Sequence, residues 1–455
     1  MKMLRNKCKA SLLTVAFVPL LLAAQTQPRD TTRPVRYELS AAQAAEFASK
    51  NNVQVKNALL DVKIQEQTNR ELTGAAYPQI SASGTMQYNL KLPVSLIPAE
   101  FFGGTPGTFE KLPFGVKWNA TAGVSINQLL FDGQVFVGLQ ARETILNFQQ
   151  KNVEVTDMLI KTNIYKIYYQ LVASKRQIEL IDANIERFEK LLSDTRIMYE
   201  NGFSEKLDID KVNVQLTNLQ TEKLKALNQI SNGFLGLKTL MGMPVRDELV
   251  LTDTLNEALI RDGMLDPGNF QYADRKEFQY AQLGIKLNEY NIKRYKLSKL
   301  PTVSLNGYYN KNAQRNEFDF FASGDWFDIS AITLDIKVPI FTGFSNNAKI
   351  ARAKFELQKS VNELDNLKLV IDNDIEQARI NFRSAIASLD YQRKNMELAE
   401  TVYLQTKRKY EAGTGSQTEI NAAQTELKSA QTNYITSLYD AIIARVDFLK
   451  ATGKF

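Results

Sequence analysis

Four segments of the chain alternate between apolar or small residues and polar residues with a period of two. This alternation is typical of β-strands whose two faces meet different environments. In the first segment polar residues hold the odd positions from Gln79 to Lys91, and Ile80 and Met86 are among the apolar residues between them. The pattern predicts strands over about residues 79–92, 116–130, 302–310 and 328–340.

The alternation alone fits two kinds of sheet. A soluble antiparallel sheet with one face on a core alternates in the same way. The segments here run to about 12 residues, close to the length that crosses an outer membrane at a tilt. Aromatic residues near the expected strand ends or loops favour a membrane sheet, because an interfacial girdle places them there. They are Tyr88, Trp118, Tyr308, Tyr309 and Trp326.

Backbone groups inside a bilayer must all be paired, so a lipid-facing sheet has to close on itself. Four strands cannot close, and about eight make a barrel that side chains fill. Several chains therefore have to share one barrel, and three chains would supply about twelve strands.

Very long helical stretches follow each pair of strands. Apolar residues recur there at alternating steps of four and three, which predicts helices that wrap around one another. About 65 residues of helix rise roughly 100 Å. A fibrous coiled coil would show the same heptads, but it would not contain paired amphipathic hairpins. The heptad positions are Ile160, Ile164, Ile167, Leu171, Ile178, Ile181, Ile185, Phe188 and Leu192, then Leu357, Val361, Leu364, Ile371, Ile375, Ala378, Phe382, Ala385 and Leu389. The expected helices cover about residues 134–200, 204–241, 344–411 and 416–451.

The chain repeats one plan twice, with an offset near 210 residues. Each half has a helix, a Pro, two strands, a Phe-x-Gly stop and long helices with one glycine break. The landmarks are Pro78, Phe131, Gly133, Tyr199, Gly202 and Gly242, then Pro301, Phe341, Gly343, Tyr410, Gly413 and Gly453. This plan predicts a first repeat over 25–242, a connector over 243–274 and a second repeat over 275–455.

The first residues have the composition of an export signal. Four basic residues precede an apolar run from Leu12 to Leu22, so residues 1–24 are predicted to be a signal peptide. The net charge of +6 falls to about +2 without those four residues, so it gives no indication of nucleic-acid binding. No later segment reaches about 18 uninterrupted apolar residues, and inner-membrane helices are not expected.

The chain lacks the side chains that most catalytic sites use. It has no His, and its only cysteine, Cys8, lies in the expected signal. Asp372 and Asp374 fit a solvated helix face, and Gly103 and Gly104 fit a loop rather than a phosphate cradle. We therefore expect no enzyme activity, no cofactor and no metal site.

Two strand-to-helix stretches resemble a signature of the TolC-type outer-membrane efflux channel family. One reads VPIFTG and contains Pro339, Phe341 and Gly343. The other reads QLLFDG, contains Phe131 and Gly133, and lacks the proline. The order of the landmarks resembles the family over nearly all of the chain after the signal.

The resemblance implies a fold, a location and partners. The fold would be a mixed α and β membrane protein: a homotrimer whose twelve-stranded transmembrane β-barrel is continued by a long periplasmic α-helical coiled-coil barrel. Each chain would give four strands from its two structural repeats. The barrel would lie in outer-membrane lipid and the tunnel in the periplasm. Its tip would meet a periplasmic adaptor protein and an inner-membrane pump of RND or ABC type.

The resemblance also implies roles for the turns between the long helices. Family tip glycines lie in the surface that adaptor hairpins engage, although Gly turns between helices are common for structural reasons alone. The expected docking residues are Gly202, Phe203, Ser204, Gly413, Thr414 and Gly415.

A periplasmic constriction is implied at the second turn. Tyr410 and Glu419 match family positions, whereas Gly415 and Ala422 stand where an arginine and a second acidic residue would be. Rings of carboxylates favour cations in other pores. The alternative is that Glu419 is an exposed helix carboxylate with no special role.

Two functional classes remain open from the sequence. One is a channel subunit that conducts drugs, other small molecules or proteins out of the cell. The other is a non-conducting coiled-coil scaffold or adhesin of the envelope. Nothing in the sequence identifies the cargo.

Overall fold

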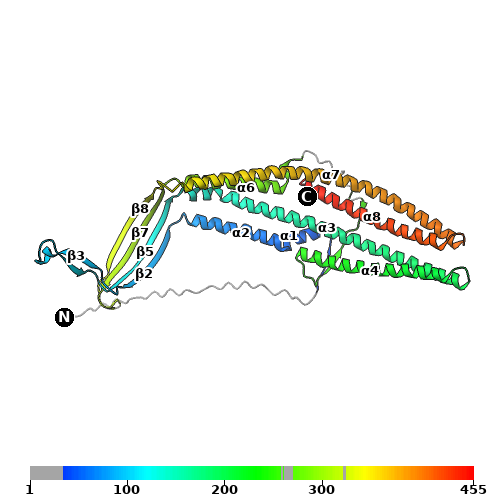
Figure 1. The fold of residues 1–455 in the computed structure, drawn as a ribbon, viewed down its shortest axis with the longest axis horizontal. Coiled ribbons are helices and arrows are strands. Elements are labelled where there is room, and N and C mark those ends of the chain that lie inside the picture. The colour runs from blue at the N-terminus through cyan, green and yellow to red at the C-terminus, as the bar shows by residue number, and fades with distance from the viewer. Residues whose placement is uncertain (1–33, 258–259, 261–269, 321–323) are drawn as a thin grey trace, which may run out of the picture.

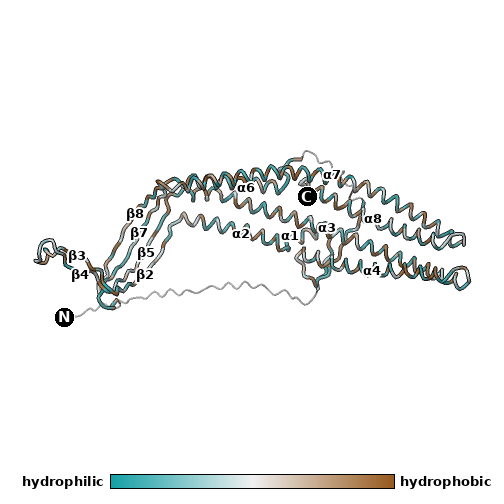
Figure 2. Tube along the Cα trace, viewed as in Figure 1, coloured by the Kyte–Doolittle hydropathy of each residue, from teal (hydrophilic) through white to brown (hydrophobic). Residues whose placement is uncertain are grey.

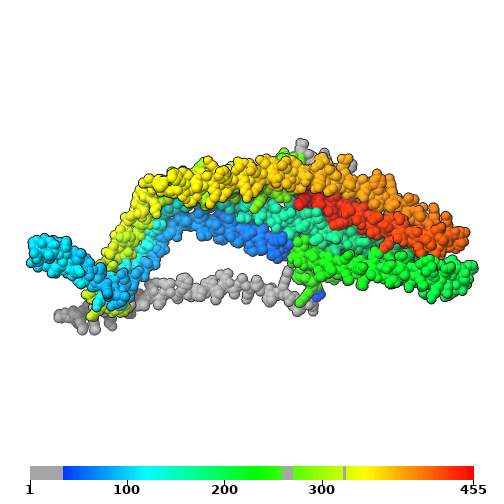
Figure 3. Space-filling view, in the orientation of Figure 1, coloured from blue at the N-terminus to red at the C-terminus, as the bar shows by residue number. Residues whose placement is uncertain are grey.

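The chain forms an elongated, curved body with a sheet at one end and long helices along the rest (Figures 1 and 3). The computed structural model describes residues 34–257, 260, 270–320 and 324–455. The expected signal peptide and part of the expected connector lie outside the described residues.

Four long antiparallel strands form the sheet, in the spatial order β2-β5-β7-β8. Among the described residues, no strand pairs with the outer edge of β2 or of β8. The strands are β2 (Gln79–Tyr88), β5 (Trp118–Phe131), β7 (Thr302–Arg315) and β8 (Phe327–Lys337).

In the half of the sheet nearer the helices, the register gathers the apolar positions of all four strands on one face. Toward the outer end the two faces mix, because Lys311 and Asp328 lie on the apolar face and Phe327 and Ile329 lie on the polar one. Ile80 lies opposite Ile126, which lies opposite Gly307, which in turn lies opposite Ile332. The polar positions form the other face, where Gln79, Asn127, Asn306 and Thr333 are paired in one row. Both faces are largely exposed, and Ile332 is 82% exposed. The sheet therefore has an apolar side that the described chain covers only at its outer end, where Phe320 packs with Ala120 and Ala313.

The third strand is longer than the sequence predicts. It was expected to end near residue 310, but β7 continues to Arg315 and pairs with β5 up to Trp118. Its last residues are polar, so hydrophobic alternation does not mark them. Tyr308 and Tyr309 consequently lie within the strand, and their expected place near a strand end is wrong.

The outer rim of the sheet has an aromatic cluster around Trp118. Its ring lies 4.6 Å from that of Tyr88 and 5.1 Å from that of Phe318. Phe320 packs on Trp118 at 6.4 Å and on Trp326 at 6.3 Å. These rings pack together at the end of the sheet that lies farthest from the helices.

A second hairpin extends the link between β2 and β5. β2 ends at Tyr88, and residues that were expected to continue it lead into β3 (Val94–Pro98) and β4 (Phe109–Pro113). The short 3-10 helix η1 (Ala99–Phe102) lies between these two strands. Figure 1 shows this hairpin beyond the far end of the sheet.

The long helices form two hairpins whose turns lie at the end opposite the sheet (Figure 1). α3 and α4 make one hairpin, and α7 and α8 make the other. α1 and α2 pack on α3, and α6 packs between α3 and α7. The long helices are α3 (Gly133–Glu200), α4 (Lys206–Met241), α7 (Ser345–Glu411) and α8 (Gln417–Ala451). The shorter ones are α1 (Ala41–Asn51), α2 (Val53–Gly74), α6 (Lys276–Leu297) and the 3-10 turn η2 (Tyr272–Asp274).

The heptad positions supply much of the helical core. Ile164 and Ile371 are fully buried, and Phe188 and Leu389 are 3% and 1% exposed. Figure 2 shows apolar and polar residues interspersed along the helices. Within the described part of the chain, none of the helices has the length and apolar content to cross a bilayer.

A small parallel sheet ties the start of the described chain to the middle of the sequence. β1 (Arg36–Leu39) pairs with β6 (Glu248–Leu251). Beside it the phenol of Tyr168 on α3 is fully buried. Its hydroxyl donates to the Leu39 carbonyl at 2.8 Å and accepts from the Thr252 and Asp253 amides at 3.1 Å each. One side chain thus satisfies three backbone groups from two distant segments.

Replacement of Tyr168 by Phe is expected to lower the free energy of unfolding by about 2 kcal/mol, because three buried backbone groups lose their partner. Thermal or guanidinium unfolding followed by circular dichroism would measure the change. Tyr165→Phe is the control, since among the described residues no hydrogen bond joins the Tyr165 hydroxyl to β1 or β6. Equal stability of the Tyr168→Phe protein and the parent would contradict the assigned role.

Candidate functional site: hairpin turns, strand-to-helix junctions and the two-faced sheet

The two turns at the end of the helical hairpins share one backbone geometry. Gly202 and Gly413 have φ angles of +79° and +71°, which L side chains rarely adopt. The Gly202 amide donates to the Tyr199 carbonyl at 3.0 Å, and the next amide donates to the Met198 carbonyl at 2.8 Å. The second turn repeats both bonds from Gly413 and the residue after it. This pair of backbone hydrogen bonds is the Schellman motif, which ends helices at glycine.

Each turn is followed at once by a capped helix start. In the second turn the Ser416 amide donates to the Glu419 carboxylate at 3.3 Å, and the Glu419 amide donates to the Ser416 hydroxyl at 3.2 Å. Asp208 occupies the matching position in the first turn, where its carboxylate accepts from the Ser204 hydroxyl at 3.2 Å. The exposed Glu419 carboxylate, which was expected at a constriction, therefore caps α8 in this chain.

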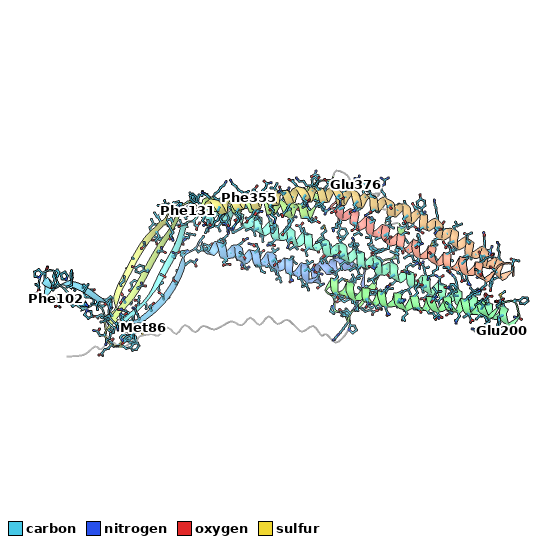
Figure 4. The ribbon with its side chains drawn as sticks, viewed as in Figure 1. Met86, Phe102, Phe131, Glu200, Phe355 and Glu376 are labelled. Carbon is cyan, nitrogen blue, oxygen red and sulfur yellow. The ribbon has the colours of Figure 1, made fainter. Side chains whose placement is uncertain are left out.

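The two turns differ in the surface that they present. The first turn has Phe203 at its end with 81% of the side chain exposed, and Ile197 and Leu207 beside it are 55% and 56% exposed. The second turn has Thr414, whose amide and hydroxyl both donate to the Lys409 carbonyl. The first turn is thus apolar and the second polar. Figure 4 places Glu200, the last residue of α3, at this end of the molecule.

Tyr410 lies inside the helical packing. It is 8% exposed and belongs to the apolar cluster that joins the two helical hairpins near their turns. Its hydroxyl lies 3.5 Å from that of Thr195 on α3. Tyr410 therefore holds the two hairpins together in the isolated chain, and the structure does not bring it onto a free surface with Glu419.

The Phe-x-Gly motifs join strands to helices in two different ways. Gly133 is the first residue of α3 and is buried against α6, because a Cβ there would come within 2.7 Å of the Leu297 carbonyl oxygen. Gly343 has a φ angle of +59° in an open link, where no described residue lies within 4 Å of an added Cβ. The same motif therefore serves close packing in one repeat and a backbone turn in the other.

An aromatic pair accompanies each of these motifs. The ring centres of Phe131 and Phe136 lie 5.5 Å apart, as do those of Phe341 and Phe344. Pro339 follows the end of β8 and supplies no amide donor, which helps to end the strand. Figure 4 shows Phe131 at the junction between the sheet and the helices.

Side-chain hydrogen bonds run across the polar face of the sheet near this junction. Asn127 on β5 donates to Asn306 on β7, and Asn306 donates to the carboxylate of Asp335 on β8. Two residues farther along β2, the hydroxyls of Ser81 and its partner Ser125 on β5 lie 2.8 Å apart. The polar side chains of this face can therefore form hydrogen bonds with water. The apolar side chains of the opposite face cannot.

The sequence did not reveal a contact that holds the second helical hairpin. The Glu257 carboxylate accepts from the Arg393 guanidinium at 3.1 Å and from the Tyr434 hydroxyl at 2.8 Å. Burial and this hydrogen bond raise the pKa of Tyr434 to about 12. Burial also raises the pKa of Tyr169 to about 12. No motif marks these residues, because their partners are far away in sequence.

Among the described residues there is no group of three or more His, Cys, Asp or Glu side chains that could hold a metal ion. The features that the structure does bring together are mechanical: capped turns, strand-to-helix joints and a sheet with two unlike faces.

The sequence matches the outer membrane efflux protein family over residues 44–243 and 272–454. The chain belongs to this family. It is similar to the outer membrane protein TolC of Vibrio cholerae, with 20% identity over 73% of this chain and 76% of TolC. It is also similar to the outer membrane efflux protein BepC of Brucella suis, with 22% identity over 90% of this chain and 84% of BepC.

Solved structures of outer membrane proteins have the same fold as this chain. The structure of the outer membrane protein VceC from Vibrio cholerae aligns with a TM-score of 0.71 and 16% sequence identity. The alignment covers 91% of this chain and 96% of VceC. The family that the sequence resembles is therefore confirmed.

Replacement of Glu419 by Ala is expected to weaken the cap of α8 by about 1 kcal/mol, because the Ser416 amide loses its acceptor. Hydrogen exchange measured by mass spectrometry would then show about fivefold faster exchange at that turn. Glu419→Gln should exchange like the parent, since a glutamine oxygen can accept the same bond. Unchanged exchange in the Ala variant would show that the carboxylate does not support the turn.

Proposed function

We propose that the chain is one subunit of an outer-membrane export channel that passively conducts substrates from the periplasmic side to the exterior. The carrying observation is the two-faced sheet, whose apolar face is exposed in every strand and whose outer edges have no partner in the described chain. Lipid would cover the apolar face, and water would fill the space beside the polar one. Family membership supports this assignment.

The edges of the sheet support a shared barrel. Backbone groups on the free edges of β2 and β8 need partners inside a membrane, and identical copies can supply them in a ring. We propose a homotrimer, in which β2 of each copy pairs with β8 of the next. Three copies would close a twelve-stranded barrel, continued into the periplasm by a tunnel of long helices.

Two exposed apolar flanks of the helical part support the same ring. β8 and α7 lie along one long side of the body, and β2, α2 and α4 lie along the other (Figure 1). On α7, Phe355, Leu369 and Tyr391 are 74%, 68% and 71% exposed. On the other flank, Ile64 and Leu224 are each 61% exposed. A ring would bury each flank against the opposite flank of the next copy, as heterologous interfaces do.

The hairpin turns are the proposed contact with other proteins. They lie at the end farthest from the sheet, which would face the inner membrane. We propose that a periplasmic adaptor engages Gly202, Phe203 and Ser204 together with Gly413, Thr414 and Gly415, and that an inner-membrane pump of RND or ABC type supplies the energy. Drugs, other small molecules or proteins would be the cargo.

The proposed constriction rests on Glu419. Its carboxylate is exposed beside the second turn, and three copies would form a ring of negative charge. Such a ring favours cations at a narrow point. Tyr410 contributes by fixing the position of α7 against α3, which keeps the second turn in place.

Purified protein reconstituted into planar bilayers is expected to form trimeric, water-filled pores with stepwise conductance. Glu419→Gln, which keeps the cap of α8, should lower the preference for cations over anions, and Asp208→Asn in the first turn is the matched control. A folded monomer without conductance would refute the channel. A membrane-bound trimer without conductance would support the scaffold or adhesin instead.

Gly202→Trp and Gly413→Trp are expected to abolish export while trimers still form, because an indole would cover the proposed docking surface. Asn at either position is the matched control, since asparagine tolerates a positive φ and is small. Export would be measured as drug accumulation in cells, and trimers by crosslinking. Normal export by both Trp variants would remove the docking assignment.

A further inference from the structure

The hairpin of β3 and β4 has one mainly apolar face whose large side chains are exposed. Its register places Val94, Leu96, Pro98, Phe109 and Pro113 on the same side as Lys111. Leu96 and Phe109 are 62% and 63% exposed. At its end, Phe101 and Phe102 are 79% and 57% exposed. Ser95 and Glu110 lie on the other face, together with Ile97 and Leu112, which are half-buried.

The hairpin is held in shape by its own hydrogen bonds. At its end, the Ala99 amide donates to the Thr108 carbonyl at 2.9 Å, and the Gly107 amide donates to the Glu100 carboxylate at 3.1 Å. At its base, the Phe114 amide donates to the Pro93 carbonyl at 2.8 Å. The exposed apolar side chains therefore belong to an ordered surface.

No other element among the described residues packs extensively on β3 or β4. An isolated two-stranded hairpin is at best marginally stable in water. A contiguous apolar surface on it usually marks a contact with another molecule. The structure thus leaves one face of the hairpin without cover.

The position of the hairpin limits what can cover this face. Figure 4 shows Met86 at the far end of the sheet and Phe102 farther out, and Figure 3 shows the hairpin clear of the rest of the body. If the sheet spans the membrane, the hairpin stands beyond it on the outer side, where the hydrocarbon core does not reach. The hairpin also follows β2, an edge strand, and therefore rises beside the proposed junction with the next copy.

We infer that the apolar face of the β3–β4 hairpin packs against a neighbouring copy of this chain at the outer mouth of the ring. The inference rests on the proposed trimer and extends its interface from the strand edges to the exterior. The hairpin would act as a clasp across the junction, and the three clasps would border the opening through which cargo leaves.

Site-specific photocrosslinking can test this contact in intact outer membranes. The photoreactive amino acid p-benzoylphenylalanine would replace Leu96 on the apolar face, Glu110 on the opposite face as the matched control, and Met86 on β2 as a reporter of the strand junction. We expect covalent dimers from the Leu96 and Met86 positions, identified by mass spectrometry as two copies of this chain. The Glu110 position should give at most one tenth of that yield.

Each other result overturns the inference. An adduct of the Leu96 position with lipopolysaccharide or with a different protein would assign the face to that partner. Dimers from Met86 without dimers from Leu96 would remove the clasp and leave the channel standing. Loss of dimers at both positions, with no trimer on gels, would remove the proposed trimer as well.

Discussion

The backbone along the free edges of β2 and β8 is the constraint on which the rest of the structure depends. A sheet with one apolar and one polar face can meet lipid and water at once, but only if its edges find partners. A single chain cannot supply them with four strands. The helical part follows the same layout, with one apolar flank below each edge. In the proposed ring, the same neighbouring copies would therefore cover both the sheet edges and the helical flanks.

The two repeats show how one plan can diverge while its joints stay the same. Both turns use a glycine with positive φ, and both of the following helices begin with a side-chain cap. The exposed chemistry at these turns is nevertheless different, with Phe203 in one and Thr414 in the other. Joint geometry is fixed by backbone hydrogen bonds, whereas the exposed side chains are free to adapt to different contacts.

The sequence could predict features that depend on neighbours along the chain. Period-two alternation located the four long strands, heptads such as Ile164 and Phe188 located the long helices, and glycines located the turns. The pattern did not predict strand ends made of polar residues, as the extension of β7 to Arg315 shows. The β3–β4 hairpin was not predicted, because its short strands alternate over too few residues.

Long-range contacts at the candidate site could not be predicted at all. Tyr168 bonds to segments 129 and 84 residues away, and Glu257 bonds to Arg393 at a separation of 136 residues. Single residues of this kind leave no periodic trace. Nor could the sequence tell that Tyr410 is buried between hairpins, because a tyrosine on a heptad helix fits either an interior or a surface.

The parallel pairing of β1 with β6 has a consequence for how the chain acquires its shape. Val35 is bonded to Asp247, and the start of α1 is bonded to Asp253, each across 212 residues. Segments so far apart meet slowly, because closing a long loop costs entropy before any contact compensates for it. If the chain folds from its N-terminus, β1 therefore stays unpaired until the α3–α4 hairpin and β6 are present. Until then the β1–β6 sheet is not formed, and the Tyr168 hydroxyl lacks the backbone partners that this sheet supplies.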